Sequence, residues 1–113
     1  MRSMAYDEKL AARVREILRG RKKLTERKMF GGVGYMLGGN LCCGVLKDEL
    51  IVRVGPDASE AALKEPNTRV FDLTGVAMKG WVVVKPAGLK AGLKGWVERG
   101  AAFAASLPVK AKG

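Results

Sequence analysis

The segment from residue 29 to residue 54 places the strongest constraint on how this chain can fold. Six glycines fall within its first sixteen residues, and the apolar residues between them are spaced as in strands. Gly38, Gly39 and Asn40 suit a tight hairpin turn, because glycine and asparagine tolerate a positive φ. The sequence therefore predicts a meander of three neighbouring strands, near residues 33–37, 41–46 and 50–54.

Amphipathic helices are predicted on both sides of this meander. Residues 7–20 carry one apolar stripe, which contains Leu10, Val14 and Leu18. A short helix runs through Leu63, and the last helix runs from about residue 89 to residue 106. Its apolar face combines small residues with the single large Trp96, which indicates close approach to a sheet. Residues 25–28 are expected to connect the first helix to the sheet, and residues 70–73 and 81–84 to add two strands.

The predicted order is α-β-β-β-α-β-β-α, an α+β fold. Short connections favour an antiparallel five-stranded sheet with helices mainly on one face, in two layers. All 113 residues are expected to form a single domain, with an ordered core over about residues 5–107 and a loose C-terminal tail.

Composition favours a folded cytoplasmic protein. Apolar residues make up 48% of the chain and charged residues 28%, values typical of globular domains. No apolar run approaches the roughly 20 residues of a membrane span, and the N-terminus lacks the apolar core of a signal peptide. Cys42 and Cys43 are adjacent, so we expect one in the core and one on the other face of the sheet, both reduced.

The residue types argue against catalysis. The chain contains no histidine, which excludes Ser-His and Cys-His nucleophile pairs and zinc sites that need histidine. Its glycines match neither a dinucleotide-binding loop nor a P-loop, since Leu37 stands where the former needs its third glycine and Asn40 where the latter needs lysine. The sequence predicts no enzyme, cofactor or metal. A small-ligand enzyme using Asp72 or Glu65 is the least favoured alternative.

Positive charge is concentrated at the two ends of the chain. The net charge is +10; residues 1–28 contribute +6 and residues 81–113 contribute +5. Six basic residues lie within ten positions, more than the end of a helix needs. This basic cluster consists of Arg19, Arg21, Lys22, Lys23, Arg27 and Lys28.

Two interpretations of the basic cluster stay open. It is either a solvated connector or a surface that contacts phosphates. If the first and last helices are neighbours, Lys90, Lys94 and Arg99 extend the same face. A third kind of site, an aromatic platform on the sheet that stacks nucleic-acid bases, would use Tyr35, Phe71 and Trp81, but core packing is the favoured role for these rings.

Two motifs resemble a known family. Residues 27–35 read RKMFGGVGY and residues 77–81 read AMKGW. Both resemble the N-terminal domain of the TfoX/Sxy family of bacterial competence regulators, and the resemblance extends from about Tyr6 to Leu107. It implies a two-layer α+β domain of the secretion-chaperone-like kind. Full-length regulators of this family also carry a C-terminal helical domain, so this chain is expected to be a stand-alone N-terminal module.

The protein is expected to be a non-enzymatic regulatory or adaptor domain that binds a protein or nucleic-acid partner. The resemblance implies a role in the transcriptional regulation of competence. A protein-interaction module or homodimer without a nucleic-acid role is the alternative. A membrane partner is not expected, and the protein is expected to be a monomer or a homodimer.

Overall fold

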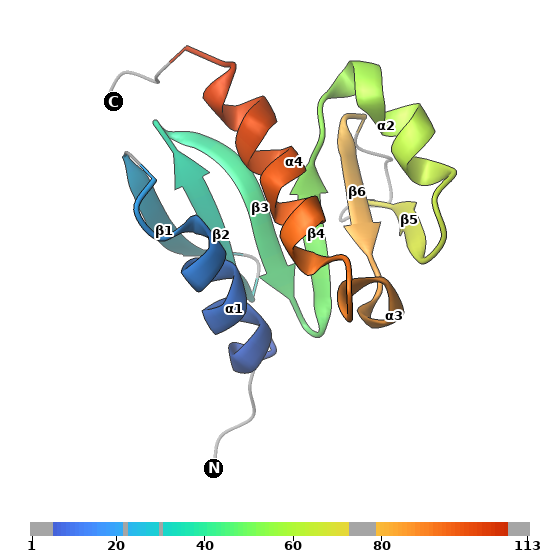
Figure 1. Ribbon diagram of the computed structural model, residues 1–113, viewed down its shortest axis with the longest axis horizontal. Helices are drawn as coiled ribbons and strands as arrows, with labels where there is room; N and C mark the ends of the chain where they lie inside the picture. The colour runs from blue at the N-terminus through green and yellow to red at the C-terminus, as the bar shows by residue number, and fades with distance from the viewer. Residues whose placement is uncertain (1–5, 22, 30, 73–78, 109–113) are drawn as a thin grey trace.

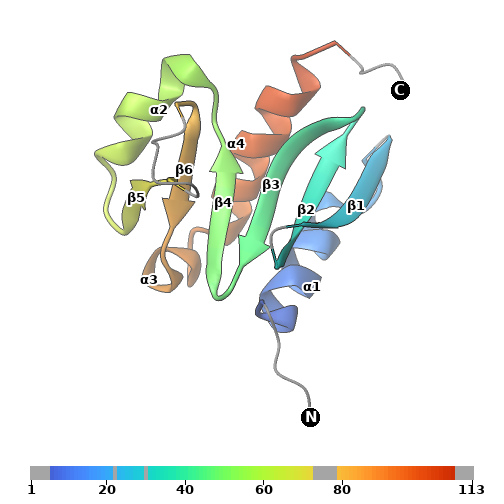
Figure 2. The ribbon, with the colours of Figure 1, turned by 180° about the vertical axis from the view of Figure 1, so that it is seen from behind.

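The computed structural model describes residues 6–21, 23–29, 31–72 and 79–108. In these ranges a six-stranded antiparallel sheet has the strand order β1-β2-β3-β4-β6-β5. Four helices lie on one face of this sheet, as the opposite views in Figures 1 and 2 show. The elements are α1 (Glu8–Leu18), β1 (Leu24–Met29), β2 (Gly32–Leu37), β3 (Asn40–Leu46), β4 (Glu49–Arg53), α2 (Pro56–Leu63), β5 (Thr68–Val70), β6 (Trp81–Val84), α3 (Pro86–Leu89) and α4 (Leu93–Ala105).

The predicted three-strand meander is confirmed. β2, β3 and β4 are consecutive neighbours, and Gly38 and Gly39 adopt φ values of 62° and 83° in the turn between β2 and β3. The first helix is also confirmed: the Asp7 carboxylate caps α1 by accepting hydrogen bonds from the backbone N–H groups of Lys9 and Leu10. Leu10, Val14 and Leu18 are buried along its inner stripe.

Three predicted boundaries are wrong. The sheet has six strands rather than five, because residues 24–29 form the edge strand β1 where a connector was expected. The strand expected at residues 70–73 begins earlier, as β5, and Thr68 anchors its start by donating to the carbonyl oxygen of Glu65 at 2.8 Å. The last helix is divided into α3 and α4, separated near Gly92.

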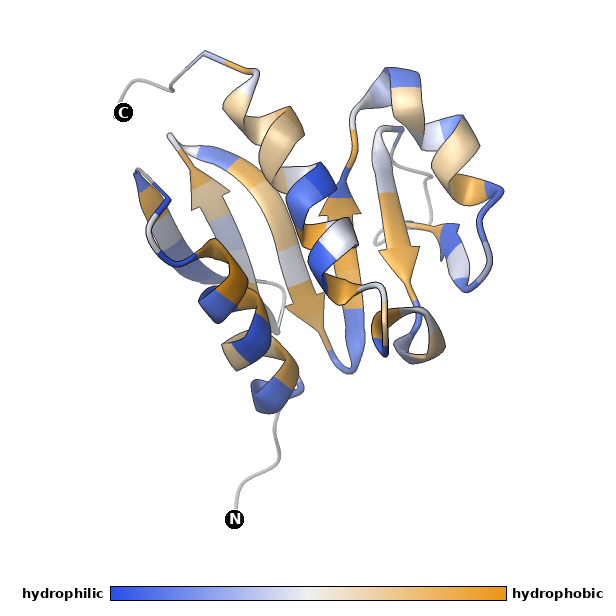
Figure 3. Ribbon diagram, in the orientation of Figure 1, coloured by the Kyte–Doolittle hydropathy of each residue, from blue (hydrophilic) through white to orange (hydrophobic). Residues whose placement is uncertain are grey.

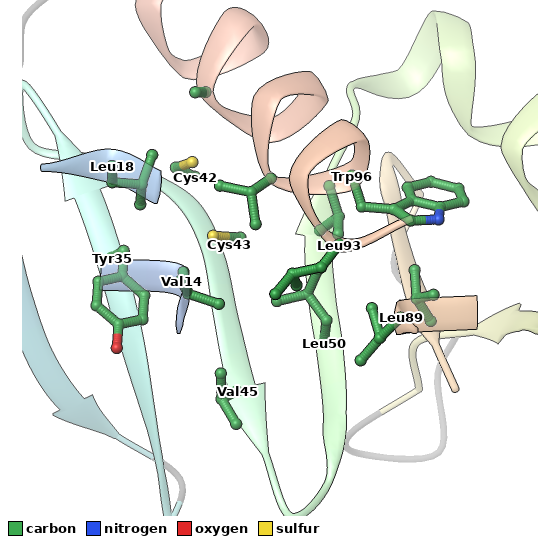
Figure 4. Close-up of a cluster of buried hydrophobic side chains, with 14 of the residues drawn as sticks. Val14, Leu18, Tyr35, Cys42, Cys43, Val45, Leu50, Leu89, Leu93 and Trp96 are labelled. Carbon is green, nitrogen blue, oxygen red and sulfur yellow. The ribbon is translucent and has the colours of Figure 1, made fainter. Parts of the chain in front are cut away.

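The main core lies between the sheet and the helix layer. Figure 3 shows the apolar sides of α1 and α4 turned toward apolar strands, and Figure 4 shows the packed side chains. Tyr35, Leu50, Val52 and Val97 are fully buried there. The core is therefore assembled from the meander and from helices at both ends of the chain.

The prediction for the two cysteines is wrong in one respect: Cys42 and Cys43 are both buried in this same core. A β-bulge causes this, because Tyr35 pairs with Cys43 while the next residue, Met36, pairs with Leu41. Cys42 is the extra residue of the bulge, so its side chain does not point to the face opposite Cys43 as it would in a regular strand. A hydrogen bond with Cys42 and burial raise the pKa of the Cys43 thiol.

Candidate functional site

The basic cluster extends from the end of α1 through the following turn into β1. Gly20 and Lys23 have positive φ values of 89° and 59°, which reverse the chain direction between the two elements. Lys22 lies outside the described residues. The other five cations are therefore spread over a helix end, a turn and an edge strand rather than gathered on one face.

Two cations of the cluster are held in ion pairs. Arg19 contacts Glu16 at 2.9 Å on the exposed side of α1. Arg21 binds Glu98 of α4, which ties the end of α1 to the last helix. Arg19 therefore pairs within the end of α1, and Arg21 links α1 to α4.

The remaining cations of the cluster are exposed. Arg27 pairs with Gly34 and Lys28 pairs with the buried Val33, so these two side chains point to opposite faces of the sheet. Lys23 lies in the turn before β1, and the Lys28 side chain is on the helix side of β1. In the described ranges neither lysine forms an ion pair. We call Lys23, Arg27 and Lys28 the basic edge.

The proposed extension toward the last helix holds only in part. α1 and α4 are neighbours and Lys94 is exposed on α4, but Lys90 lines a cavity at the start of α1, the end opposite the basic cluster. Arg99 lies on the other side of α4, where it binds Glu65 at 2.8 Å and stacks 4.0 Å from the centroid of the Trp96 ring. Arg99 therefore joins α4 to the chain segment that follows α2 and does not extend the basic cluster.

A second basic surface lies in the helix layer, and sequence reasoning missed it. A cavity of about 290 Å³ opens between the start of α1 and α3. Lys9, Arg13 and Lys90 line it, together with Asp7 and Asp48. Lys9 and Arg13 are four residues apart on a helix, a spacing that puts both side chains on one face. This spacing is the sequence signal that could have indicated the second basic surface.

The ion pair between α1 and the edge strand fixes the position of β1. Arg15 donates two hydrogen bonds of 3.0 Å to the Glu26 carboxylate, which lowers the pKa of Glu26. Because the Glu26 pKa is depressed, the contribution of this pair to stability is lost as pH falls through the acidic range. Both side chains are partly exposed, so solvent screening keeps the contribution below about 1 kcal/mol.

The two carboxylates considered for catalysis lie at the surface or in an ion pair. Asp72 is exposed, and Glu65 is held by Arg99 at 2.8 Å. Within the described ranges no three His, Cys, Asp or Glu side chains approach closely enough to share a metal ion. No helix in those ranges is long and apolar enough to cross a bilayer.

The three candidate stacking aromatics are divided between the two faces of the sheet. Tyr35 is fully buried under the helices, and its hydroxyl donates a 3.0 Å hydrogen bond to the carbonyl oxygen of Ala11. Phe71 and Trp81 lie on the other face in a small cluster, with their ring centroids 5.8 Å apart. Burial of Phe71 to 8% exposure leaves little of its ring for a nucleic-acid base.

Tyr35 makes folding stability depend on alkaline pH. Burial, and secondarily the nearby Glu26 carboxylate, raise the pKa of Tyr35 to about 12. Unfolded tyrosine ionises near pH 10, so stability should fall by up to about 3 kcal/mol between about pH 10 and 12. Tyr35→Phe should lose about 1 kcal/mol at neutral pH because Ala11 loses its donor, yet lack this alkaline loss. Urea denaturation across the pH range measures both effects, and an equal alkaline loss in the two proteins would contradict the prediction.

A family model described as the TfoX N-terminal domain matches residues 16–104. The chain belongs to the TfoX N-terminal domain family. Neither the curated proteins nor the solved structures yield a match. In this TfoX N-terminal domain the matched span begins inside α1 and ends at the last turn of α4, so it contains the whole sheet and the basic edge.

Proposed function

We propose that this TfoX N-terminal domain is a non-enzymatic bacterial regulator of the competence-associated kind, acting in the cytoplasm by binding a macromolecular partner. Membership of the family, over residues 16–104, is the observation that carries the proposal. The secretion-chaperone-like arrangement of the two layers, which the resemblance implies, belongs to the same proposal.

The regulatory role can be tested in the natural host. Deletion of the gene should lower both the transcription of DNA-uptake genes and the frequency of transformation. The intact chain should restore both. Unchanged transcription and transformation after deletion would reject the competence role.

Nucleic acid is the first partner to test. The net charge of +10 and the exposed cations of the basic edge favour an anionic surface. The cavity between α1 and α3, lined by three cations and two aspartates, lies on the same side of the sheet as the Lys28 side chain and offers further cations to phosphates. Binding of this kind is mainly electrostatic, because each phosphate contact releases condensed counterions.

Affinity for duplex DNA should therefore fall steeply between about 50 and 200 mM salt. If Lys23 and Lys28 each contact a phosphate, replacing both by alanine should reduce the slope of log K against log salt by about 1.8. Fluorescence anisotropy with a labelled duplex, repeated with single-stranded DNA and RNA, measures this slope.

Lys64→Ala with Lys85→Ala is the matched control, since it removes the same charge from two exposed sites elsewhere. This control should leave the slope unchanged. The melting temperatures of both double variants should stay near that of the parent, because the substituted side chains are exposed. Absence of binding at the lowest salt would remove nucleic acid as a partner and leave the regulatory role to a protein contact.

A protein partner is the second candidate. The sheet face opposite the helices carries half-buried apolar side chains, including Leu41, Leu46 and Trp81. An apolar face of this kind supports a role as a protein-interaction module. The protein would then either bind a partner as a monomer or form a homodimer.

A further inference from the structure

The face of the sheet opposite the helices has an unusual central row. The strand register aligns Arg27, Gly34, Gly44 and Ile51 across β1, β2, β3 and β4. Two adjacent strands thus present glycine side by side at the centre of this face. Within the described residues no helix lies on this side of the sheet, as Figure 2 shows.

The paired glycines leave an apolar hollow. The hollow has a volume of about 40 Å³, roughly three times what one water-sized sphere occupies. Gly34 and Gly44 line it, and the side chains around it come from the same row and from the rows on either side. These are Leu41, Leu46, Ile51, Phe71 and Trp81.

The glycines have a structural reason as well. A Cβ added at Gly44 would lie 2.9 Å from the carbonyl oxygen of Val33 and 3.5 Å from the Cα of Gly34. The close approach of β2 and β3 therefore requires glycine at this position and leaves the hollow as its consequence. A hollow of this origin is a rigid part of the sheet rather than a gap between mobile side chains.

Cations flank the hollow. Arg27 lies one strand away from Gly34, at the lateral spacing of about 4.8 Å between strands. Arg53 starts from the same face, and its guanidinium carbon lies between two rings, 5.7 Å from the centroid of Trp81 and 5.4 Å from that of Phe103 in α4. Arg69 is also on this face, but Glu49 neutralises it.

We infer that this face docks an acidic segment of a partner protein, which places one branched aliphatic side chain in the hollow and carboxylates beside Arg27 and Arg53. The apolar lining and the volume suit the tip of a leucine or valine. The flanking arginines attract carboxylates, with which a guanidinium forms paired hydrogen bonds.

Charge and shape argue against the other occupants. A second copy of the chain would bring Arg27 and Arg53 toward the same positive face, which like-charge repulsion disfavours. A nucleic-acid base needs polar partners for its edge and a flat exposed ring for stacking, whereas this hollow is small and its lining almost wholly apolar.

The test uses the full chain, labelled with ¹⁵N, and a synthetic nonapeptide with one central leucine among eight glutamates. Backbone amide shifts should change most at Gly34, Gly44 and Ile51. A peptide with serine in place of the leucine should bind at least about tenfold more weakly, because it buries no aliphatic side chain. A peptide with lysines in place of the glutamates should not bind this face.

Two protein variants separate the hollow from the overall charge. Arg27→Glu should weaken binding of the leucine peptide about tenfold or more, whereas Lys64→Glu, an equal charge change at an exposed site after α2, should have little effect. Leu41→Ser removes part of the wall without changing charge, and should weaken the leucine peptide more than the serine peptide. Each variant is first shown to keep the dispersed amide spectrum of the parent.

Several results would overturn the inference: no binding of the leucine peptide, equal affinity for the leucine and serine peptides, shifts confined to the helix layer, or equal effects of Arg27→Glu and Lys64→Glu. Concentration-dependent shifts at these amides without peptide would assign the face to a second copy. Tighter binding of a single-stranded oligonucleotide at the same amides would assign it to nucleic acid. The inference goes beyond the proposed regulatory function. The peptide titration tests the hollow and the duplex titration tests nucleic-acid binding, so either proposal can fail while the other stands.

Discussion

Gly100→Ala should destabilise the fold by about 3 kcal/mol. A Cβ at this position would lie 2.4 Å from the carbonyl oxygen of Cys42 and 3.2 Å from Cγ1 of Val52. The nearer atom belongs to the main chain of β3, so it cannot rotate away and α4 has to move off the sheet. We expect the steric conflict to lower the free energy of unfolding by about 4 kcal/mol, more than the usual 1–3 kcal/mol for overpacking. The higher helix propensity of alanine offsets about 1 kcal/mol of this loss.

Gly95→Ala is the matched control in the same helix. Gly95 is exposed and a Cβ there meets no atom within 4 Å, so the substitution should stabilise the protein by about 0.5–1 kcal/mol. Urea denaturation of the two variants and the parent gives the three free energies of unfolding. If the two substitutions change stability in the same direction, the close packing of α4 on β3 is wrong.

The sequence predicted this helix–sheet contact in outline. Small residues on one face of the last helix indicated close approach, and Gly100 and Ala101 are both buried against the sheet. The meander was predictable for a similar reason: glycine turns and alternating apolar residues are local signals. These features need no information from distant parts of the chain.

The features that sequence reasoning missed depend on distant partners. β1 reads as a connector because Thr25, Glu26, Arg27 and Lys28 show no apolar alternation; it becomes a strand by pairing with β2 at the edge of the sheet. The burial of Cys42 depends on a bulge, which arises only when the registers of β2 and β3 are compared.

The candidate site also combines features that local sequence signals predict with features that depend on distant partners. A count of charges identified the basic cluster, but not which cations are neutralised, because Glu98 lies far along the chain from Arg21. Likewise, the pairing of Gly34 with Gly44 beside Arg27 follows from strand register and not from any motif. Composition therefore predicted an anionic partner, whereas the hollow opposite the helices required the structure.

Trp96→Ala should have the largest effect on stability of the substitutions considered, about 3–5 kcal/mol. Trp96 is 7% exposed, belongs to the main core and lies beside Leu89 and Leu93 in Figure 4. Its removal leaves a cavity where α3 and α4 pack on the sheet, and the surrounding strands cannot collapse to fill it. Chemical denaturation followed by far-UV circular dichroism measures the loss without relying on tryptophan fluorescence.

Two comparisons separate the buried ring from its polar neighbour. Arg99→Ala removes the cation stacked on Trp96 and the ion pair with Glu65, and should cost only about 1 kcal/mol because both groups are partly exposed. Trp81→Ala should cost about 2 kcal/mol, since Trp81 is half-buried in the smaller cluster on the opposite face. If Arg99→Ala proved as damaging as Trp96→Ala, the ion pair and its stacking would stabilise α4 more than the buried ring does. If Trp81→Ala were the more damaging of the two tryptophan variants, the face opposite the helices would be the principal core, and docking of a partner there would have to be abandoned.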